Sequence, residues 1–328
     1  MKKGVTHGLT SLAKISLAAG IIALLLWKKV DLRELAVLLR GIDPRIFVAC
    51  WFGYGLLFLL SARRWKALVG VQGIRARYGS LLGFCLIGAF FNNIMPVSMG
   101  WDILKAWYCA RVDHSRKAGA VSSVLADRIV GFVSLFAIGF LGLVVNAGAP
   151  GLRQASVLFL ALFATICAAL ALLYSRTLLA RIPFAKALLD RMPFRENIRR
   201  LYDSLYVYRS HPRVLAKALM ISCVMQLIFI LVMLGTARAL GIVGVTFRHL
   251  LLLSPLIGTI AAIPLTPSGW GTMEGAFCYF FPAIGVGAEQ ALALDLVTRV
   301  LVISWSLVGG VIYALPRWRG DPAAQKPG

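Results

Sequence analysis

The stretch Gly88-Ala-Phe-Phe-Asn-Asn-Ile-Met-Pro-Val-Ser-Met-Gly-Trp-Asp102 decides how the rest of the chain is interpreted. An apolar, helix-like run leads into it, and Asn92, Asn93 and Pro96 then follow at what should be membrane depth. An unpaired amide is costly in hydrocarbon, and proline breaks the helical hydrogen-bond ladder. Irregular backbone at that depth is tolerated only where protein buries it or where it lines a polar cavity. The stretch predicts a broken, re-entrant element beside a polar site; the alternative is a helix that ends at Asn92 in an ordinary loop.

Composition places this stretch in a membrane protein. The chain has 328 residues, of which 59% are hydrophobic and 15% charged, and its mean hydropathy is +0.81. Apolar runs recur from end to end, so the sequence predicts an all-α, polytopic helical bundle with no separate soluble domain. The net charge of +22 would suggest nucleic acid for a soluble protein, but here the basic residues lie mostly between apolar runs, as in cytoplasmic loops. We therefore expect no nucleic-acid partner.

The residues that commonly carry chemistry form no recognised motif. The six cysteines and four histidines are scattered, without CxxC or zinc-ligand spacing. Such cysteines are typical of small core residues rather than of a disulfide framework. Walker A, GxSxG and HExxH patterns do not occur in the sequence. We expect no metal, no cofactor and no catalytic residue, and the sequence leans away from an enzyme.

Charge along the chain predicts that both termini are cytoplasmic. Residues 63–78 and 103–117 are rich in basic residues, and both are expected to be cytoplasmic loops. Because they flank the opening stretch, the chain between them has to enter the membrane and return as a hairpin. An uncleaved first helix is expected before Lys28. Further spans are expected at about 46–62, 119–145, 155–174, 214–234 and 292–315.

These spans define one transmembrane domain, at about residues 1–316. Its first half covers about residues 1–175 and its second half about residues 214–316. A cytoplasmic linker at about 175–213 joins the halves, and residues 317–328 are expected to be a disordered cytoplasmic tail.

A second stretch contains the same types of residue in the same order as the first. Pro267-Ser-Gly-Trp-Gly-Thr-Met-Glu274 and Pro96-Val-Ser-Met-Gly-Trp-Asp102 each contain a proline, then Gly-Trp and then a carboxylate. In each half a long helix with an embedded arginine follows, Arg128 or Arg299, at nearly the same distance from the carboxylate. The charges of the flanking loops predict that the two hairpins enter the membrane from opposite sides. The sequence therefore predicts inverted repeats with two broken hairpins, an architecture of alternating-access transporters.

The two motifs together resemble the signatures of the lysylphosphatidylglycerol synthase transmembrane family, also called the flippase-like family. The first signature reads Asn92-Asn93-x-x-Pro96-x-x-x-Gly100-x-Asp102-x-x-Lys105, with Ala126-Asp127-Arg128 downstream. The second reads PxTPxGxGxxE, from Pro264 to Glu274. Members of this family are inner-membrane proteins of bacteria and archaea that are implicated in moving lipids between leaflets. The resemblance covers essentially the whole chain and implies the same membrane location.

The chain also departs from the family pattern. Trp101 and Ser268 stand where a second glycine is usual, and Lys105 stands where arginine is common. These changes could alter head-group selectivity. The best-known members carry an additional cytosolic aminoacyl-transferase domain, for which this sequence has no counterpart, so transferase activity is not expected.

A lipid that crosses the bilayer needs a polar site that shelters its head group. Arginine, asparagine and the N–H groups of broken helices suit a phosphate or a similar anion. Asp102 and Glu274 could pair with the arginines in the empty state or bind a proton; the alternatives are a snorkelling arginine and a carboxylate that merely caps a helix. The predicted substrate-binding residues are Asn92, Asn93, Pro96, Gly100, Asp102, Lys105, Arg128, Pro267, Gly269, Gly271, Glu274 and Arg299.

The sequence thus predicts an inner-membrane lipid translocase that moves a polar or anionic lipid between leaflets. Two alternatives stay open. One is a membrane-embedded enzyme that acts on a lipid or polyprenyl phosphate, with Asp102 or Glu274 as the base. The other is a non-transporting partner of a lipid-synthesis complex. The expected partners are membrane lipids and, for the last alternative, a lipid-synthesis enzyme.

Overall fold

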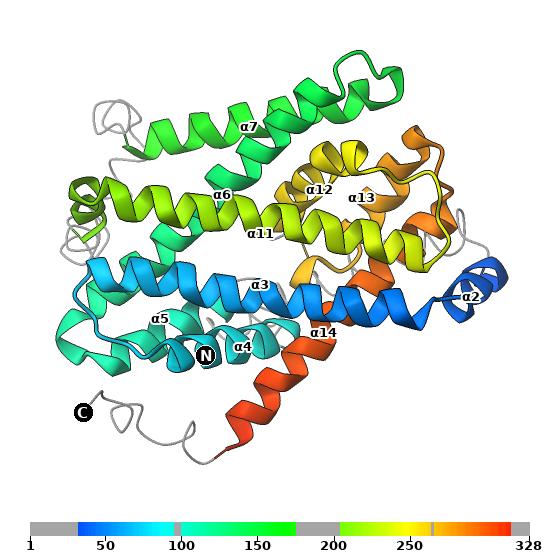
Figure 1. Cartoon of the computed structure of the whole chain (residues 1–328). Helices are drawn as coiled ribbons and strands as arrows, with labels where there is room; N and C mark the ends of the chain where they lie inside the picture. Colours follow the sequence, from blue (N-terminus) through cyan, green and yellow to red (C-terminus); the bar gives the residue numbers. More distant parts are fainter. Residues whose placement is uncertain (1–31, 95–99, 175–203, 264–265, 316–328) are drawn as a thin grey trace, which may run out of the picture.

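The regular structure of the chain is helical wherever the computed structural model describes it, at residues 32–94, 100–174, 204–263 and 266–315 (Figure 1). Four helices in these ranges are long and apolar enough to cross a membrane. They are α3 (Pro44–Val71), α6 (Lys117–Val145), α11 (Pro212–Ala239) and α14 (Ala288–Ala314). The prediction of an all-α, multi-pass membrane protein is confirmed.

The remaining helices are shorter. They are α2 (Leu32–Arg40), α4 (Tyr78–Ile94), α5 (Gly100–Val112), α7 (Arg153–Tyr174), α12 (Phe247–Ala262) and α13 (Thr272–Phe280), with 3-10 turns η1 (His114–Arg116), η2 (Pro150–Leu152), η3 (Val207–Ser210), η4 (Pro267–Gly269) and η5 (Phe281–Ile284). α4 and α5 form one hairpin, and α12 and α13 form another. Each of these four arms is shorter than the roughly 20 residues that a membrane-spanning helix needs.

Helices α3 and α11 lie side by side and run in opposite directions (Figure 1). At one end, the backbone N–H of Asp43 before α3 donates to the carbonyl of Ala239 at the end of α11, at 2.9 Å. At the other end, the hydroxyl of Tyr208 before α11 donates to the carbonyl of Leu68 near the end of α3, also at 2.9 Å. The start of each helix is therefore fixed to the end of the other.

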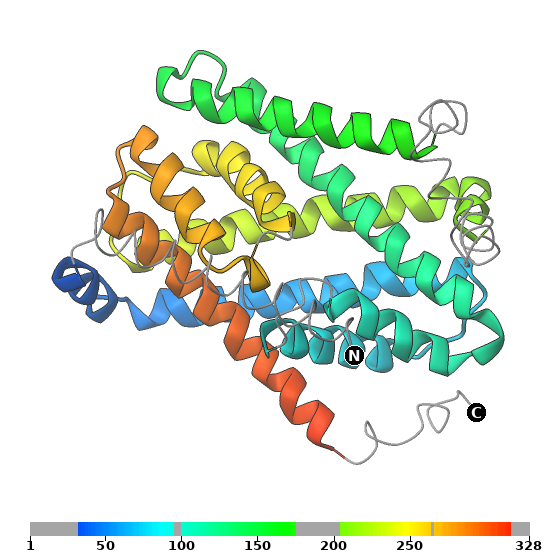
Figure 2. The ribbon, with the colours of Figure 1, turned by 180° about the vertical axis from the view of Figure 1, so that it is seen from behind.

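The two hairpins enter from opposite ends of this helix pair. α4 begins just after α3 ends, and α12 begins just after α11 ends. Because α3 and α11 are antiparallel, these starting points lie at opposite ends of the bundle, in both views (Figures 1 and 2). The hairpin tips meet in the interior, where the Ser268 hydroxyl donates to the carbonyl of Asn92 at 2.5 Å. The structure thus has the inverted arrangement that the sequence predicts.

The halves interlock through equivalent contacts. α14 packs on α4 of the first half, and α6 packs on α12 of the second half. A glycine lies at each crossing: a Cβ on Gly309 would clash with the Leu86 carbonyl, and a Cβ on Gly142 would clash with the Leu251 backbone. Small residues allow close helix contacts in membranes, where van der Waals packing drives association. Each hairpin is therefore held by the long helix of the opposite half.

The crossing at Gly309 predicts a stability difference between two glycine variants. Gly309→Ala should lower the free energy of unfolding by about 1–3 kcal/mol, because the added methyl group overpacks a backbone contact. Gly70→Ala on α3 is the control, since a Cβ there meets nothing within 4 Å; it should be neutral or stabilise by roughly 0.5–1 kcal/mol. Denaturant unfolding in detergent measures both. Equal stability of the two variants would contradict the close crossing.

Buried apolar side chains form a large cluster around each hairpin. In the first half, Trp65 contacts the edge of Phe84, and the rings of Phe84 and Tyr108 stack with centroids 4.9 Å apart. In the second half, the rings of Phe277 and Phe281 stack at the same 4.9 Å separation. In the first half this packing joins the two arms of the hairpin, α4 and α5, whereas in the second half both stacked rings belong to the returning segment.

Several predicted helix ends are wrong. α3 continues to Val71 rather than ending near Ala62, so Arg63 and Arg64 are helical and not part of a loop. Residues 103–112 belong to α5, and residues 32–40 form α2. Arginine and lysine are good helix formers, so a run of basic residues marks a membrane side without marking the end of a helix.

Other predictions fall outside the part of the chain that the structure describes. These are the first helix and Pro96, most of the linker (residues 175–203) and the tail (residues 317–328). The linker's last residues are described: they contain η3 and the start of α11.

The hairpin arrangement predicts which sites share a membrane side. The guanidinium of Arg116 donates to the carbonyl of Gln72 at 2.7 Å, so the α5–α6 junction lies beside the end of α3. In a cysteine-free background, Arg75→Cys and Ser115→Cys should therefore react with an impermeant thiol reagent from the same side of the membrane. Ala283→Cys, before α14, should react only from the opposite side. Labelling of Arg75→Cys and Ser115→Cys from opposite sides would contradict the hairpin.

Candidate functional site

Each half brings the carboxylate of its hairpin to the arginine of the following long helix. Asp102 is the third residue of α5, and Glu274 is the third residue of α13. Arg128 Nε lies 2.6 Å from Asp102 Oδ2, and Arg299 Nη2 lies 2.8 Å from Glu274 Oε1. The two pairs come from equivalent helices in the two halves, as the repeat in the sequence predicts.

Glu274 both caps a helix and pairs with the arginine. Its Oε2 accepts a hydrogen bond from the backbone N–H of Gly271 at 2.6 Å, just before α13. A carboxylate near a helix N-terminus is favoured by the helix dipole. Gly269 and Gly271 have φ values of 73° and 83°, which glycine adopts without strain. These glycines form the turn that brings Glu274 to Arg299. Glu274 can therefore cap α13 with one carboxylate oxygen and pair with Arg299 through the other.

The two pairs differ in exposure. The Arg128 and Asp102 side chains are 46% and 23% exposed, whereas those of Arg299 and Glu274 are 10% and 3% exposed. The Arg299 guanidinium also lies 4.0 Å from the centroid of the Trp270 ring. The second pair is therefore enclosed and tightly held, and the first remains accessible to a ligand.

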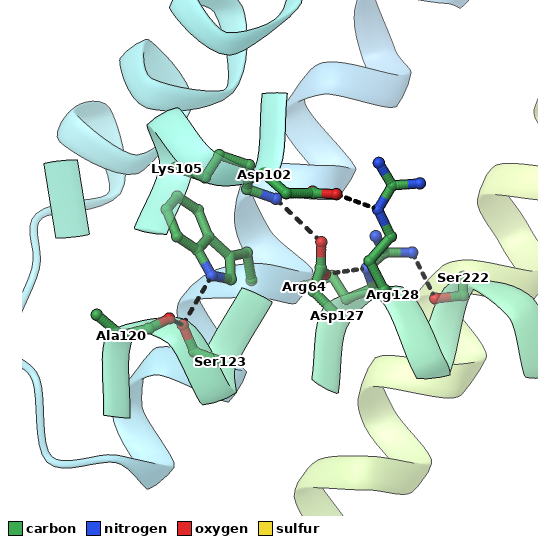
Figure 3. A network of polar contacts seen from close by, with 9 residues as sticks. Arg64, Asp102, Lys105, Ala120, Ser123, Asp127, Arg128 and Ser222 are labelled. Carbon is green, nitrogen blue, oxygen red and sulfur yellow. Dashed lines mark hydrogen bonds and ion pairs between the residues drawn. The ribbon is translucent and has the colours of Figure 1, made fainter. Parts of the chain in front are cut away.

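Beside the first pair lies a buried ionic network around Asp127, which Figure 3 shows. Asp127 Oδ1 accepts from Arg64 Nε at 2.7 Å, and its Oδ2 accepts from Lys105 Nζ at 3.0 Å. Arg64 Nη1 donates in turn to the Ser222 hydroxyl at 2.8 Å. This network connects α3, α5, α6 and α11, and so ties the first hairpin to the helix pair α3 and α11.

Aromatic and hydroxyl groups hold Lys105 in this network. Its ammonium lies 4.4 Å from the centroid of the Trp65 ring, and the Trp65 indole N–H donates to the Ser123 hydroxyl at 3.1 Å. Lys105 is only 1% exposed. In this arrangement Lys105 neutralises Asp127, whereas the sequence predicts a contact with substrate.

The remaining predicted site residues lie at or near the two hairpin tips. Asn92 and Asn93 are close to the end of α4, and the Nδ2 of Asn93 is buried without a hydrogen-bond partner among the described residues. Gly100 begins α5, and Pro267 begins η4. Ser268, which follows Pro267, joins the tips through Asn92. The structure therefore brings the two sequence motifs into direct contact.

Sequence reasoning missed three charged partners: Arg64, Asp127 and Asp295. Asp127 stands beside Arg128 in the Ala-Asp-Arg motif, and that adjacency was a usable signal. Asp295 lies four residues before Arg299, a spacing that puts both on one face of a helix. Arg64 gave no such signal, because a basic residue after an apolar run is typical of a cytoplasmic loop.

The charges of the two clusters are opposite. In the first half, Arg64, Lys105 and Arg128 face Asp102 and Asp127, which leaves one excess positive charge. In the second cluster, Arg299 is the one cation among the described residues that faces Glu274 and Asp295, which leaves one excess negative charge when all three are ionised. The first cluster therefore suits an anion, and the second suits a proton or another cation.

Comparison with known proteins is consistent with this architecture. The family model of the lysylphosphatidylglycerol synthase transmembrane region matches residues 11–309. A UPF0104 membrane protein of Methanocaldococcus jannaschii is 22% identical over 292 residues, covering 83% of this chain and 84% of that protein. A UPF0104 membrane protein of Methanothermobacter thermautotrophicus is 23% identical over 312 residues, covering 89% and 91%. No solved structure matches the chain significantly.

Proposed function

This chain belongs to the family of the lysylphosphatidylglycerol synthase transmembrane region, and we propose that it moves a lipid with a polar or anionic head group between the leaflets of the cell membrane. One observation carries the proposal. Two short hairpins enter the bundle from opposite ends and meet at Ser268 and Asn92, each with a carboxylate–arginine pair beside its tip. Paired broken helices in inverted repeats are an architecture of alternating-access transporters.

Arg128 is the proposed first contact for the head group. Its side chain is 46% exposed, and its guanidinium forms an ion pair with Asp102. A phosphate group presents oxygens that a guanidinium binds at two points, so it can replace the carboxylate. The excess positive charge of the surrounding cluster favours this exchange. Lys105 and Arg64 contribute that charge from buried positions and hold Asp127 in place.

Arg299 is the proposed second contact, on the far side of the hairpin tips. It is enclosed by Glu274 and Trp270 in the arrangement described. A head group that passes from Arg128 to Arg299 requires the Ser268–Asn92 contact to open and the Arg299–Glu274 pair to separate. The repeat supports such an exchange, because each half offers the same pair from the opposite end of the bundle.

Reconstitution into liposomes tests the proposal. The purified protein is incorporated with a fluorescent phosphatidylglycerol, and an impermeant quencher reports how much of the lipid is exposed outside. Translocation faster than in protein-free and heat-inactivated controls, without a new lipid species on chromatography, is the expected result. A new species would instead favour the membrane-embedded enzyme. No translocation of labelled phosphatidylglycerol, phosphatidylethanolamine or a polyprenyl phosphate would contradict the proposal.

A further inference from the structure

Asp295 is a buried carboxylate with incomplete partners. It lies on α14 one turn before Arg299 and is 2% exposed. Among the described residues its Oδ2 has no hydrogen-bond partner, and Arg299 Nη2, which forms an ion pair with it, is 3.6 Å away. The same Nη2 lies only 2.8 Å from Glu274 Oε1. Two buried carboxylates thus share one guanidinium nitrogen, and Asp295 is the more distant of the two.

The neighbouring groups neutralise Glu274 better than they neutralise Asp295. Glu274 accepts a hydrogen bond from the backbone N–H of Gly271 and also forms an ion pair with Arg299. Arg299 is held in turn by the Trp270 ring. Among the described residues, Asp295 accepts no hydrogen bond from a backbone N–H and has no second cation beside it. A buried charge without a full set of partners is strongly unfavourable, so such a group tends to become neutral.

Among the described residues, no other helix packed against α14 supplies a further cation to Asp295. The charged groups that act on Asp295 are Arg299 on its own helix and Glu274 on α13. Helix α4 contains no charged residue. The described charged residues of α2, α3 and α11 are exposed, apart from Arg64. Arg64 is buried and forms an ion pair with Asp127. We therefore expect a ligand from solution to neutralise the excess negative charge of the cluster formed by Arg299, Glu274 and Asp295.

Asp127 in the first half provides the contrast. It is a buried aspartate on α6, the helix equivalent to α14, but Arg64 and Lys105 both contact it directly, at 2.7 Å and 3.0 Å. Two cations therefore keep Asp127 ionised. Asp127 thus has two cations in direct contact, whereas Asp295 shares the single guanidinium of Arg299 with Glu274.

Building on the proposed lipid transport, we propose that Asp295 is a proton-binding residue, and that proton uptake there and the binding of an anionic head group at Arg299 favour each other. One proton from water adds to Oδ2 of Asp295 and removes the excess negative charge. Arg299 can then leave the carboxylates and bind the head group, and the proton balances the charge of the phosphate. An anionic lipid and a proton are thus expected to move together.

Infrared difference spectra test proton binding separately from transport. Protein in lipid at about pH 6 should show a protonated-carboxyl absorbance that Asp295→Asn lacks. Glu289→Gln, at the first turn of the same helix, is the matched control and should keep the band. A wild-type spectrum from which Asp295→Asn removes no carboxyl band would overturn the proposal, whatever the transport assay gives.

Liposome translocation then tests the coupling. Wild-type protein and Glu289→Gln should move labelled phosphatidylglycerol about tenfold faster at about pH 6 than at about pH 8, whereas Asp295→Asn should move it at one rate at both. A pH dependence that survives in Asp295→Asn would overturn the coupling. Absence of translocation by the wild type, with the carboxyl band present, would instead contradict the proposed transport and leave the proton site standing.

Discussion

Replacing Asp127 by asparagine is expected to lower the free energy of unfolding by about 3–5 kcal/mol, because it leaves two buried cations without a counter-ion. Arg64 and Lys105 approach the two carboxylate oxygens from α3 and α5, and their side chains are 11% and 2% exposed. Asparagine preserves the size of the side chain and removes only the charge. Thermal and denaturant unfolding in detergent should therefore show an earlier transition with no new cavity to explain it.

Two further variants show whether charge is the cause. Adding Lys105→Met to Asp127→Asn removes one of the uncompensated cations and should recover part of the lost stability. Asp113→Asn is the control for an exposed pair, since Arg116 and Asp113 are 51% and 32% exposed; it should cost no more than about 1 kcal/mol. If Asp127→Asn unfolds at the same denaturant concentration as the wild type, the buried network does not stabilise the fold.

Replacing Arg299 by alanine is expected to abolish translocation, because Arg299 is the one cation that pairs with Glu274 and Asp295 among the described residues. Glu274 and Asp295 would then face each other in a buried site with no positive charge between them. Arg299→Lys should restore part of the activity. A lysine keeps the charge but lacks the planar fork that reaches two partners at once. Initial rates of lipid translocation, at matched protein incorporation, measure the three proteins.

A double-mutant cycle separates the pair from the single residues. Glu274→Ala together with Arg299→Ala should destabilise the protein by less than the sum of the two single changes, because each single change leaves an unpaired charge behind. Ser306→Ala on the same helix is a neutral comparison for this cycle, since its hydroxyl donates only to the carbonyl of Ile303 within the helix. Strict additivity would mean that Glu274 and Arg299 do not act as a pair.

The sequence motifs could predict the fold and both carboxylate–arginine pairs for a physical reason. Proline, Gly-Trp and a carboxylate are local features of a hairpin tip, and the spacing from Asp102 to Arg128 recurs from Glu274 to Arg299. A repeated local pattern implies a repeated structure, so its contacts come in pairs. Loop charges then indicated that the hairpins enter from opposite ends, which the antiparallel helices α3 and α11 explain.

The buried network could not be predicted in the same way. Arg64 meets Asp127 only because α3 continues past the apolar run and packs against α6, and nothing local to Arg64 indicates either event. Lys105 illustrates a second limit. Its place in the motif implies importance, but only the structure shows that Lys105 is buried and pairs with Asp127. Local patterns thus indicated the two carboxylate–arginine pairs, and long-range packing determined the ionic network around Asp127.

The most direct test of the proposed lipid site is the translocation rate of Arg128→Gln. The Arg128–Asp102 pair is partly exposed, so its loss should cost no more than about 1 kcal/mol of stability and leave the protein folded and inserted. A hydrogen-bonded contact to a charged group is worth about 1.5–3 kcal/mol, so the rate for labelled phosphatidylglycerol should fall about 10- to 100-fold. Arg111→Gln is the matched control, since Arg111 lies over Trp107 near the end of α5 and should keep the wild-type rate. Wild-type translocation by folded Arg128→Gln protein would contradict the account.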